Sequence, residues 1–189
     1  MRRVYLIRHG LTEGNRLRRY IGRTDEPLCT AGRAALSAAP LKGIETVYVS
    51  PLLRARETAA ILFPHARQIV VDGLREMDFG AFENRSADDM KNDAAYRAWV
   101  DGLCEGDCPG GENRRGFVAR TVRAFENICA TGGDDPLVIV AHGGTVMALM
   151  SELGEPKKDY WAWHVGAGGC LRCALDGGRL LYEGDGFDA

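Results

Sequence analysis

Two short apolar runs in this chain end in the same way, and this repetition constrains the fold more than any other feature. Residues 4–7 and 136–141 are rich in β-formers and predict two buried strands. A histidine with glycine directly after it follows each run, at His9 and at His142. One such histidine alone would be explained by packing. Because open α/β sheets bind ligands at the carboxyl ends of their strands, two of them predict a binding site at that edge.

Strand and helix patterns alternate along the rest of the chain. Further strands are predicted at 46–49, 68–71, 170–175 and 179–183, the last two as a hairpin. Helices are predicted at 31–39 with Cys29 or Thr30 as the N-cap, and at 52–63, 86–103, 114–130 and 144–153, while 155–163 is a helical turn or loop. We therefore expect one domain over residues 1–189 with an α/β fold, in which helices cover both faces of a mostly parallel sheet as a three-layer α/β/α sandwich.

Composition and charge exclude several classes of protein. The 189 residues are 46% hydrophobic and 26% charged, which is typical of a globular domain and not of a disordered chain. The net charge of −2 provides no basic field for nucleic acid. No apolar run is long enough to cross a bilayer, and the first residues lack a signal-peptide pattern. We expect a cytoplasmic protein without nucleic-acid or membrane partners, either a monomer or a homodimer.

The six cysteines predict free thiols in a chain without a secretion signal. They are Cys29, Cys104, Cys108, Cys129, Cys170 and Cys173. The pairs 104/108 and 170/173 also permit a four-thiolate zinc site by spacing. Residues three apart on a strand face opposite sides, however, which argues against that alternative for the second pair. We therefore expect no metal and no cofactor.

Charged residues gather where the predicted strands end. Arg8 closes the first strand, and Arg54 lies in the first turn of the helix after the strand at 46–49. The loop at 74–80 offers Glu76 or Asp78 as a buried acid with a raised pKa, although either could equally be solvated. Arginine forks match phosphate oxygens, and a neutral imidazole can attack phosphorus. Together these groups predict a pocket for a phosphoryl group, to which the helix start at Gly143 adds backbone N–H groups.

An arginine-rich loop follows the first strand, with Arg16, Arg18, Arg19 and Arg23. It is either a solvated basic face or an electropositive collar for an anionic substrate, and in the second case Arg23 is the strongest candidate.

Five blocks of sequence, in this order, resemble the motifs of the histidine phosphatase superfamily in its phosphoglycerate mutase-like branch. The blocks are 8–15 (RHGLTEGN), 22–28 (GRTDEPL), 50–58 (SPLLRARET), 74–80 (LREMDFG) and 140–144 (VAHGG). The resemblance implies a phosphoglycerate mutase-like fold. It implies that His9 is the nucleophile, that Glu76 is the acid and base, and that Arg8, Arg54 and His142 bind the phosphoryl oxygens. Further substrate-binding residues implied by the motifs are Asn15, Thr12, Arg23 and Gly143.

The resemblance implies a metal-independent phosphomonoesterase that acts on a small phosphorylated metabolite, releases inorganic phosphate and forms a phosphohistidine. Residues 79–86 and 109–113 are similar to the α-ribazole phosphatase group, which makes α-ribazole 5′-phosphate a candidate substrate. Phe82, Asn84 and Asn113 depart from that group's pattern and leave the substrate open. The alternatives are a phosphoglycerate mutase, for which the chain is short, and a non-catalytic module that binds a phosphorylated ligand.

Aromatic residues on two segments could line the pocket of the leaving group or could belong to the core. They are Tyr96, Trp99, Tyr160, Trp161 and Trp163. We expect most of them to be core residues.

Overall fold

The central sheet is mostly parallel, as the sequence predicts. The computed structural model describes residues 1–131, 133 and 136–187. Within these residues one sheet has the strand order β3-β2-β4-β1-β6-β7-β5, and β6 is the strand that runs antiparallel to both of its neighbours. The strands are β1 (Arg2–Arg8), β2 (Thr46–Val49), β3 (Arg67–Val70), β4 (Leu137–Ala141), β5 (Gly154–Glu155), β6 (Cys170–Asp176) and β7 (Arg179–Asp185).

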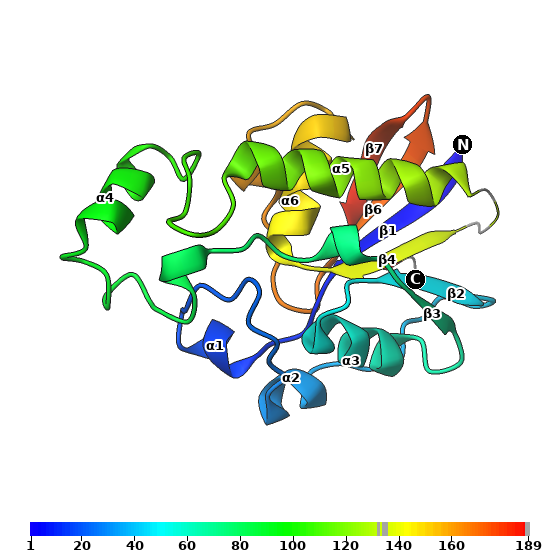
Figure 1. Ribbon diagram of the computed structural model, residues 1–189. Helices are drawn as coiled ribbons and strands as arrows, with labels where there is room; N and C mark the ends of the chain where they lie inside the picture. Colours follow the sequence, from blue (N-terminus) through cyan, green and yellow to red (C-terminus); the bar gives the residue numbers. More distant parts are fainter. Residues whose placement is uncertain (132, 134–135, 188–189) are drawn as a thin grey trace.

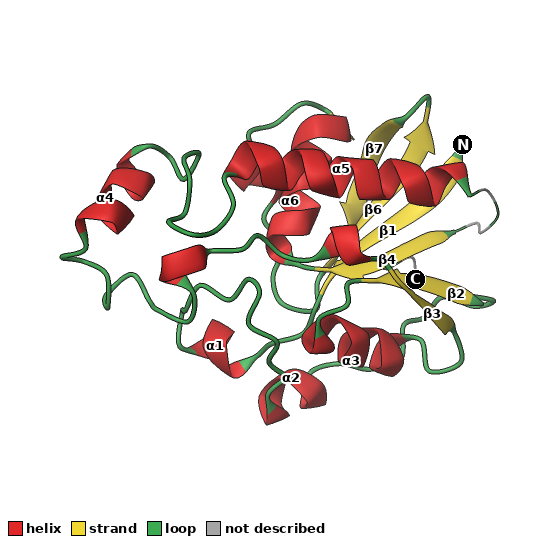
Figure 2. Cartoon of the chain, viewed as in Figure 1, coloured by secondary structure: helices red, strands yellow, loops and turns green. Residues whose placement is uncertain are grey.

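Helices cover both faces of this sheet and complete the three-layer α/β/α sandwich (Figure 1, Figure 2). The α-helices are α1 (Glu13–Arg16), α2 (Thr30–Ala34), α3 (Leu53–Leu62), α4 (Ala94–Asp101), α5 (Arg114–Ala130) and α6 (Gly143–Leu153). Short 3-10 helices are η1 (Asp72–Leu74), η2 (Gly80–Phe82) and η3 (Tyr160–Trp163). Helices α5 and α6 pack on one face and α3 on the other. Among the described residues, no helix has the length and hydropathy that a membrane span requires.

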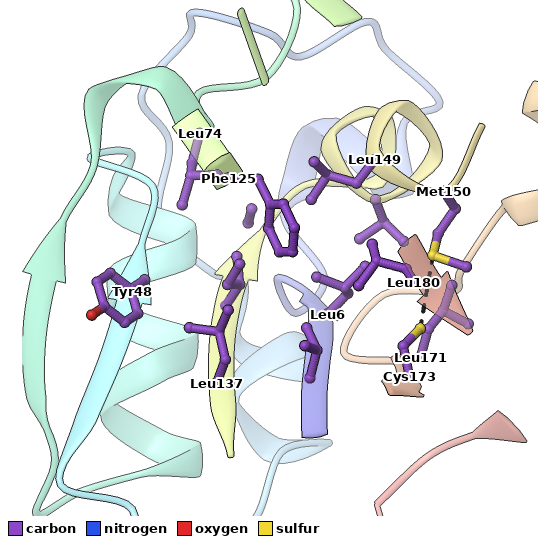
Figure 3. Close-up of a cluster of buried hydrophobic side chains, with 14 of the residues drawn as sticks. Leu6, Tyr48, Leu74, Phe125, Leu137, Leu149, Met150, Leu171, Cys173 and Leu180 are labelled. Atoms are coloured by element: carbon purple, nitrogen blue, oxygen red, sulfur yellow. Dashed lines mark hydrogen bonds between the residues drawn. The ribbon is translucent and has the colours of Figure 1, made fainter. Parts of the chain in front are cut away.

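Alternation along the central strands divides the core into two layers. On β1, Leu6 packs toward α5 and α6, whereas Tyr5 packs toward α3. Figure 3 shows Leu6 with Phe125 of α5 and Leu149 of α6 in the first layer. On β6, Cys173 belongs to that layer too, and Cys170 lies in the other one.

The register of the sheet brings three strand ends to one edge. Arg8 at the end of β1 pairs with Ala141 at the end of β4, and the last residue of β2 pairs with Val140. The backbone N–H of His9 donates to the Ala141 carbonyl at 2.9 Å, and that of Ser50 donates to Val140 at 3.1 Å. The first residues after β1, β2 and β4 are therefore held beside one another.

A third cluster of side chains lies beyond this edge of the sheet. We call residues 77–113 the α4 segment, because α4 and the loops on either side of it extend past the carboxyl ends of the strands (Figure 1). Phe82 and Trp99 are buried in its core, which joins the rest of the molecule through Phe117 of α5 and Ala148 of α6.

Two predicted helices are much shorter than the sequence pattern indicates. The helix expected at 86–103 is wrong for residues 86–93, which form turns. The Asp93 carboxylate accepts hydrogen bonds from two amides of the first turn and makes α4 begin at residue 94. The helix expected at 31–39 ends at Ala34, because the Ala39 amide donates to the Leu62 carbonyl at 2.8 Å and draws the chain toward α3. Its N-cap is Cys29, one of the two predicted residues.

The other predicted helices and strands are present, with ends that differ by two residues or fewer. The terminal hairpin is confirmed, and its turn at Gly177 and Gly178 has positive φ at both positions, as a tight hairpin requires. Four of the described elements carried no predicted pattern. They are α1, the two-residue strand β5 and the 3-10 helices η1 and η2.

Candidate active site

His9 is a buried, neutral imidazole at the end of β1. Its side chain is 4% exposed, and Nδ1 lies 2.7 Å from the carbonyl oxygen of Gly10. Because a carbonyl oxygen only accepts hydrogen bonds, Nδ1 carries the proton and Nε2 keeps its lone pair. Burial, and then the nearby charges of Arg54 and Arg8, lower the pKa of His9 to about 3. At neutral pH His9 is therefore an uncharged imidazole with a lone pair on Nε2, which is the form in which histidine can act as a nucleophile.

His142 faces His9 from the end of β4, with 5.2 Å between the ring centroids. It is fully buried, and burial holds its pKa well below the ordinary value. Nε2 lies 2.7 Å from the Ser50 hydroxyl, which also accepts a hydrogen bond from the Leu52 amide at 3.4 Å. Among the residues that the structure describes, Nε2 is the acceptor within reach of the Ser50 hydroxyl hydrogen, so the hydroxyl donates to Nε2 and the proton of the His142 ring lies on Nδ1.

The side chains of Arg8, at the end of β1, and of Arg54, in α3, also lie near His9. The Arg8 Nη1 donates to the Val165 carbonyl at 2.7 Å and lies 3.3 Å from His164 Nε2. Arg54 is fully buried in the first turn of α3. Its fork donates to the carbonyls of Ile21, Gly22 and Thr24 at 2.7–3.3 Å.

Three buried nitrogens around His9 have no hydrogen-bond partner among the residues that the structure describes. They are Arg8 Nε, Arg54 Nε and His142 Nδ1. An unpaired buried donor costs about 1–3 kcal/mol, more when it is charged, so three of them at one point need an explanation. Arg54 and Arg8 lie close enough to lower the pKa of both His9 and His142 through their charge. A compact oxyanion beside His9 Nε2 would satisfy all three donors.

Glu76 places a carboxyl group in the same site, near the two arginines. Its carboxylate accepts from the Met77 amide and from the Gly144 amide at the start of α6, both at 2.9 Å. Burial raises its pKa, although these hydrogen bonds and the two arginines act in the opposite direction. A Cβ on Gly144 would lie 2.2 Å from Glu76 Oε1, so that only glycine allows this contact. Asp78, the other predicted acid, instead accepts from the Gly80 amide at 2.8 Å.

A cavity of about 270 Å³ opens above these groups. Its floor contains Arg8, His9, Asn15, Glu76, Gly143 and Gly144. Its upper wall comes from the α4 segment, the loop after α1, the η3 region and helices α5 and α6. Five wall residues are aromatic, Tyr20, Phe79, Trp99, Tyr160 and Trp161. The others are Arg19, Arg114 and His164, which are cationic or polar, and Ile21, Met77, Cys104 and Met147.

The structure thus brings together the five predicted catalytic residues, with Asn15 and Gly143. Thr12 lies beneath the cavity floor as the N-cap of α1, and its hydroxyl accepts from the Asn15 amide at 3.2 Å. In return, the side-chain oxygen Oδ1 of Asn15 accepts from the Thr12 backbone amide at 3.4 Å, which leaves the Asn15 side-chain nitrogen for a ligand. Arg23 is outside the cavity, where its exposed guanidinium faces Asp78 at 3.5 Å.

Several wall residues were not predicted. The arginine-rich loop contributes Arg19 to the cavity instead of Arg23, and the sequence offered charge but no pattern that separates the two. Arg114 and His164 carried no signal. Tyr96, Trp99 and Trp163 are core residues, as expected for most of the aromatic set. Trp99 also lines the cavity, together with Tyr160 and Trp161.

The cysteines do not form the four-thiolate arrangement. Cys170 and Cys173 face opposite layers of the core, and Cys104 and Cys108 belong to the α4 segment. All six cysteines are free thiols. Within the part of the chain that the structure describes, no group of three His, Cys, Asp or Glu side chains is placed to hold a metal ion. Metal-independent activity stays a prediction.

Comparison with known proteins decides the family. The family model of the histidine phosphatase superfamily (branch 1) matches residues 4–183. The chain belongs to this superfamily. A Hydrogenobacter thermophilus protein provisionally named phosphoserine phosphatase 2 is 31% identical over an alignment of 193 positions, which covers 96% of this chain and 95% of that protein. A Serratia proteamaculans protein provisionally named phosphoglycerate mutase GpmB is 35% identical over 82% of this chain and 77% of its own length.

Solved structures show the same fold. The crystal structure of an Escherichia coli K-12 protein provisionally assigned as an alpha-ribazole-5′-P phosphatase superposes with a TM-score of 0.84 and 24% identity. The superposition covers 96% of this chain and 94% of that one. This likeness confirms the phosphoglycerate mutase-like fold, and the names of the relatives divide between phosphatases and mutases.

Proposed function

We propose that this histidine phosphatase superfamily member is a phosphomonoesterase that hydrolyses a small phosphorylated metabolite through a phosphohistidine at His9. The observation that carries the proposal is the group of three unpaired buried donors, Arg8 Nε, Arg54 Nε and His142 Nδ1, around a neutral imidazole. A phosphoryl group pairs these donors with its oxygens and places phosphorus beside the His9 lone pair.

In the first step, His9 Nε2 forms a bond to phosphorus while the ester P–O bond breaks. The leaving alkoxide takes the proton of Glu76, whose raised pKa favours the protonated form. In the second step, a water molecule attacks phosphorus, Glu76 takes a proton from it, and the N–P bond breaks to release inorganic phosphate. Because the transition state of phosphoryl transfer is loose, positioning and charge stabilisation by Arg8 and Arg54 supply most of the rate enhancement.

We propose α-ribazole 5′-phosphate as the first substrate to test. The motif resemblance in the α4 segment supports it, and the aromatic wall of the cavity suits a leaving group that carries a planar ring. Phosphoserine and the phosphoglycerates are the competing substrates, since relatives carry the corresponding names.

The test is a screen of purified protein for release of inorganic phosphate, with and without EDTA. The esters are α-ribazole 5′-phosphate, phosphoserine, 2- and 3-phosphoglycerate, and p-nitrophenyl phosphate. We expect hydrolysis that EDTA leaves unchanged, and an acid-labile phosphoenzyme in rapid-quench samples. Interconversion of 2- and 3-phosphoglycerate without phosphate release would make the protein a mutase. Phosphate binding without turnover of any ester would make it a non-catalytic module.

A further inference from the structure

Arg120 lies on α5, where it neither lines the cavity nor belongs to one of the sequence motifs described above. Its guanidinium nevertheless contacts the loop that carries Glu76. Its Nη1 donates to the carbonyls of Gly73 and Arg75, both at 3.0 Å. Its Nη2 lies 3.4 Å from the carbonyl of Glu76 itself. One guanidinium therefore holds the backbone at the acid and at the residues just before it.

Glu112 fixes that guanidinium in place. Its two carboxylate oxygens accept from Arg120 Nε at 2.9 Å and from Nη2 at 2.7 Å, in the two-point geometry that makes arginine pairs specific. Although burial alone would raise it, the pKa of Glu112 is held below its ordinary value by Arg120 and by the Asp78 amide. Glu112 also exchanges hydrogen bonds with Asp78 through its carboxylate and its backbone N–H, at 3.0 and 2.9 Å. The pair thus holds the acid loop on both sides of Glu76.

The side chain of Glu76 has little else to orient it. Its carboxylate is held by two backbone amides, one from the adjacent Met77 and one from Gly144. Its reach toward the leaving oxygen therefore depends on where the loop backbone lies, and an error of 1 Å at a catalytic group can cost about 10²-fold in rate.

We propose that Arg120, anchored by Glu112, is a positioning residue for proton transfer by Glu76. The proposal rests on the function proposed above, because Arg120 would act in the step in which Glu76 protonates the leaving group. We call the pair of Arg120 and Glu112 the clamp. Its loss impairs protonation of the leaving group and leaves the phosphoryl-binding groups in place.

Glu83 offers a matched control, because it holds the phosphoryl side in the same manner. Its carboxylate accepts from the amides of Gly22, Arg23 and Thr24 at 2.9–3.4 Å. The carbonyls of that loop are the ones that hold the Arg54 fork. Glu83 also accepts from the Phe79 amide at 3.1 Å, three residues beyond Glu76. Glu83→Gln therefore disturbs mainly phosphate binding, which all substrates share, rather than proton transfer.

The experiment compares two esters of similar shape that differ in their need for a proton. Phenolate is a basic leaving group, with a conjugate acid of pKa about 10, whereas p-nitrophenolate leaves readily as an anion. For Arg120→Met we expect kcat/KM to fall about 10²-fold with phenyl phosphate and only a few-fold with p-nitrophenyl phosphate. Glu112→Gln should show the same selectivity to a smaller extent. Glu83→Gln should lower both values by similar factors and weaken inhibition by inorganic phosphate.

Arg120→Lys, which keeps the charge, serves if the methionine variant does not fold, and thermal unfolding checks each protein. Losses of equal size on both esters in the Arg120 and Glu112 variants would overturn the proposal, since they would mean that the clamp only stabilises the fold. A wild-type protein that hydrolyses neither ester would instead contradict the proposed function.

Discussion

The floor and the upper wall of the cavity are built on different principles. His9, Arg54 and His142 on the phosphoryl side are at most 4% exposed, and each directly follows a strand or lies one turn into the helix after it. On the leaving-group side, Trp161 is 52% exposed, and Arg19 lies on a loop. Under the proposed function, the sheet therefore positions the groups that react, whereas loops and short helices select the substrate.

The largest effect should come from the centre of the floor. Because His9 Nε2 forms the bond to phosphorus, we expect His9→Ala to abolish both turnover and the acid-labile phosphoenzyme while the protein stays folded. The matched control is His65→Ala, which removes an exposed histidine remote from the cavity. Rapid-quench labelling and circular dichroism measure the two quantities. Near-normal turnover in His9→Ala would show that His9 is not the nucleophile.

Arg54 should follow, since in the proposed mechanism it binds the phosphoryl oxygens of every substrate. Removing one preorganised donor costs about 10²–10³-fold in kcat, and we expect a loss of that size in Arg54→Met with all esters alike. Because the side chain is fully buried and bonded to three carbonyls, the melting temperature should also fall. Steady-state kinetics on phenyl and p-nitrophenyl phosphate measure the loss. A defect restricted to one ester would place Arg54 on the leaving-group side.

The pH dependence tests the boundary between the two regions, where Glu76 meets the leaving group. The raised pKa of Glu76 keeps it protonated at lower pH, and it loses that proton as the pH rises. The ratio of kcat/KM for phenyl phosphate to that for p-nitrophenyl phosphate should therefore fall with increasing pH, because only the first ester needs the acid. His9, with a pKa of about 3, stays neutral over pH 4–9 and adds no acid limb in this range.

Glu76→Gln is the control for this profile. It should lower the ratio and make it independent of pH, since the amide has no proton to lose in this range. A ratio that still falls with pH in this variant would assign the titration to another group.

The contrast between floor and wall also explains what the sequence could predict. Buried parallel strands are continuous apolar runs, so β1 and β4 were recognisable, and parallel pairing brings their ends together whatever the loops do. The five catalytic residues follow from that rule and from motifs next to the strand ends. The fully buried Ser50 that orients His142 stands within one of those motifs.

The wall follows no such rule. The α4 segment has its own small core, and its path depends on side-chain caps such as Asp93, which replaces half of an expected helix by turns. Arg114 reaches the cavity from the start of α5, and His164 follows η3. Neither residue lies at a fixed distance in sequence from a strand end, so only the tertiary structure brings them to the site.

The smallest effect should come from Trp161 at the rim. Its ring packs edge-on against Tyr160 with 5.0 Å between centroids and is half exposed, so Trp161→Ala should leave the melting temperature nearly unchanged. A contact between the Trp161 ring and an aromatic ring of the substrate should contribute about 0.5–1.5 kcal/mol. Its loss corresponds to about 2- to 13-fold in kcat/KM. We expect this loss with α-ribazole 5′-phosphate and none in the binding of inorganic phosphate, whose oxygens meet only the floor.

Val70→Ala is the control for Trp161→Ala, because Val70 is equally exposed but lies at the end of the edge strand β3. Isothermal titration with inorganic phosphate and kinetics with the ester separate the two regions. If Trp161→Ala weakened phosphate binding as much as ester turnover, the rim would be coupled to the floor. Substrate choice and chemistry would then not be independent properties of loops and sheet.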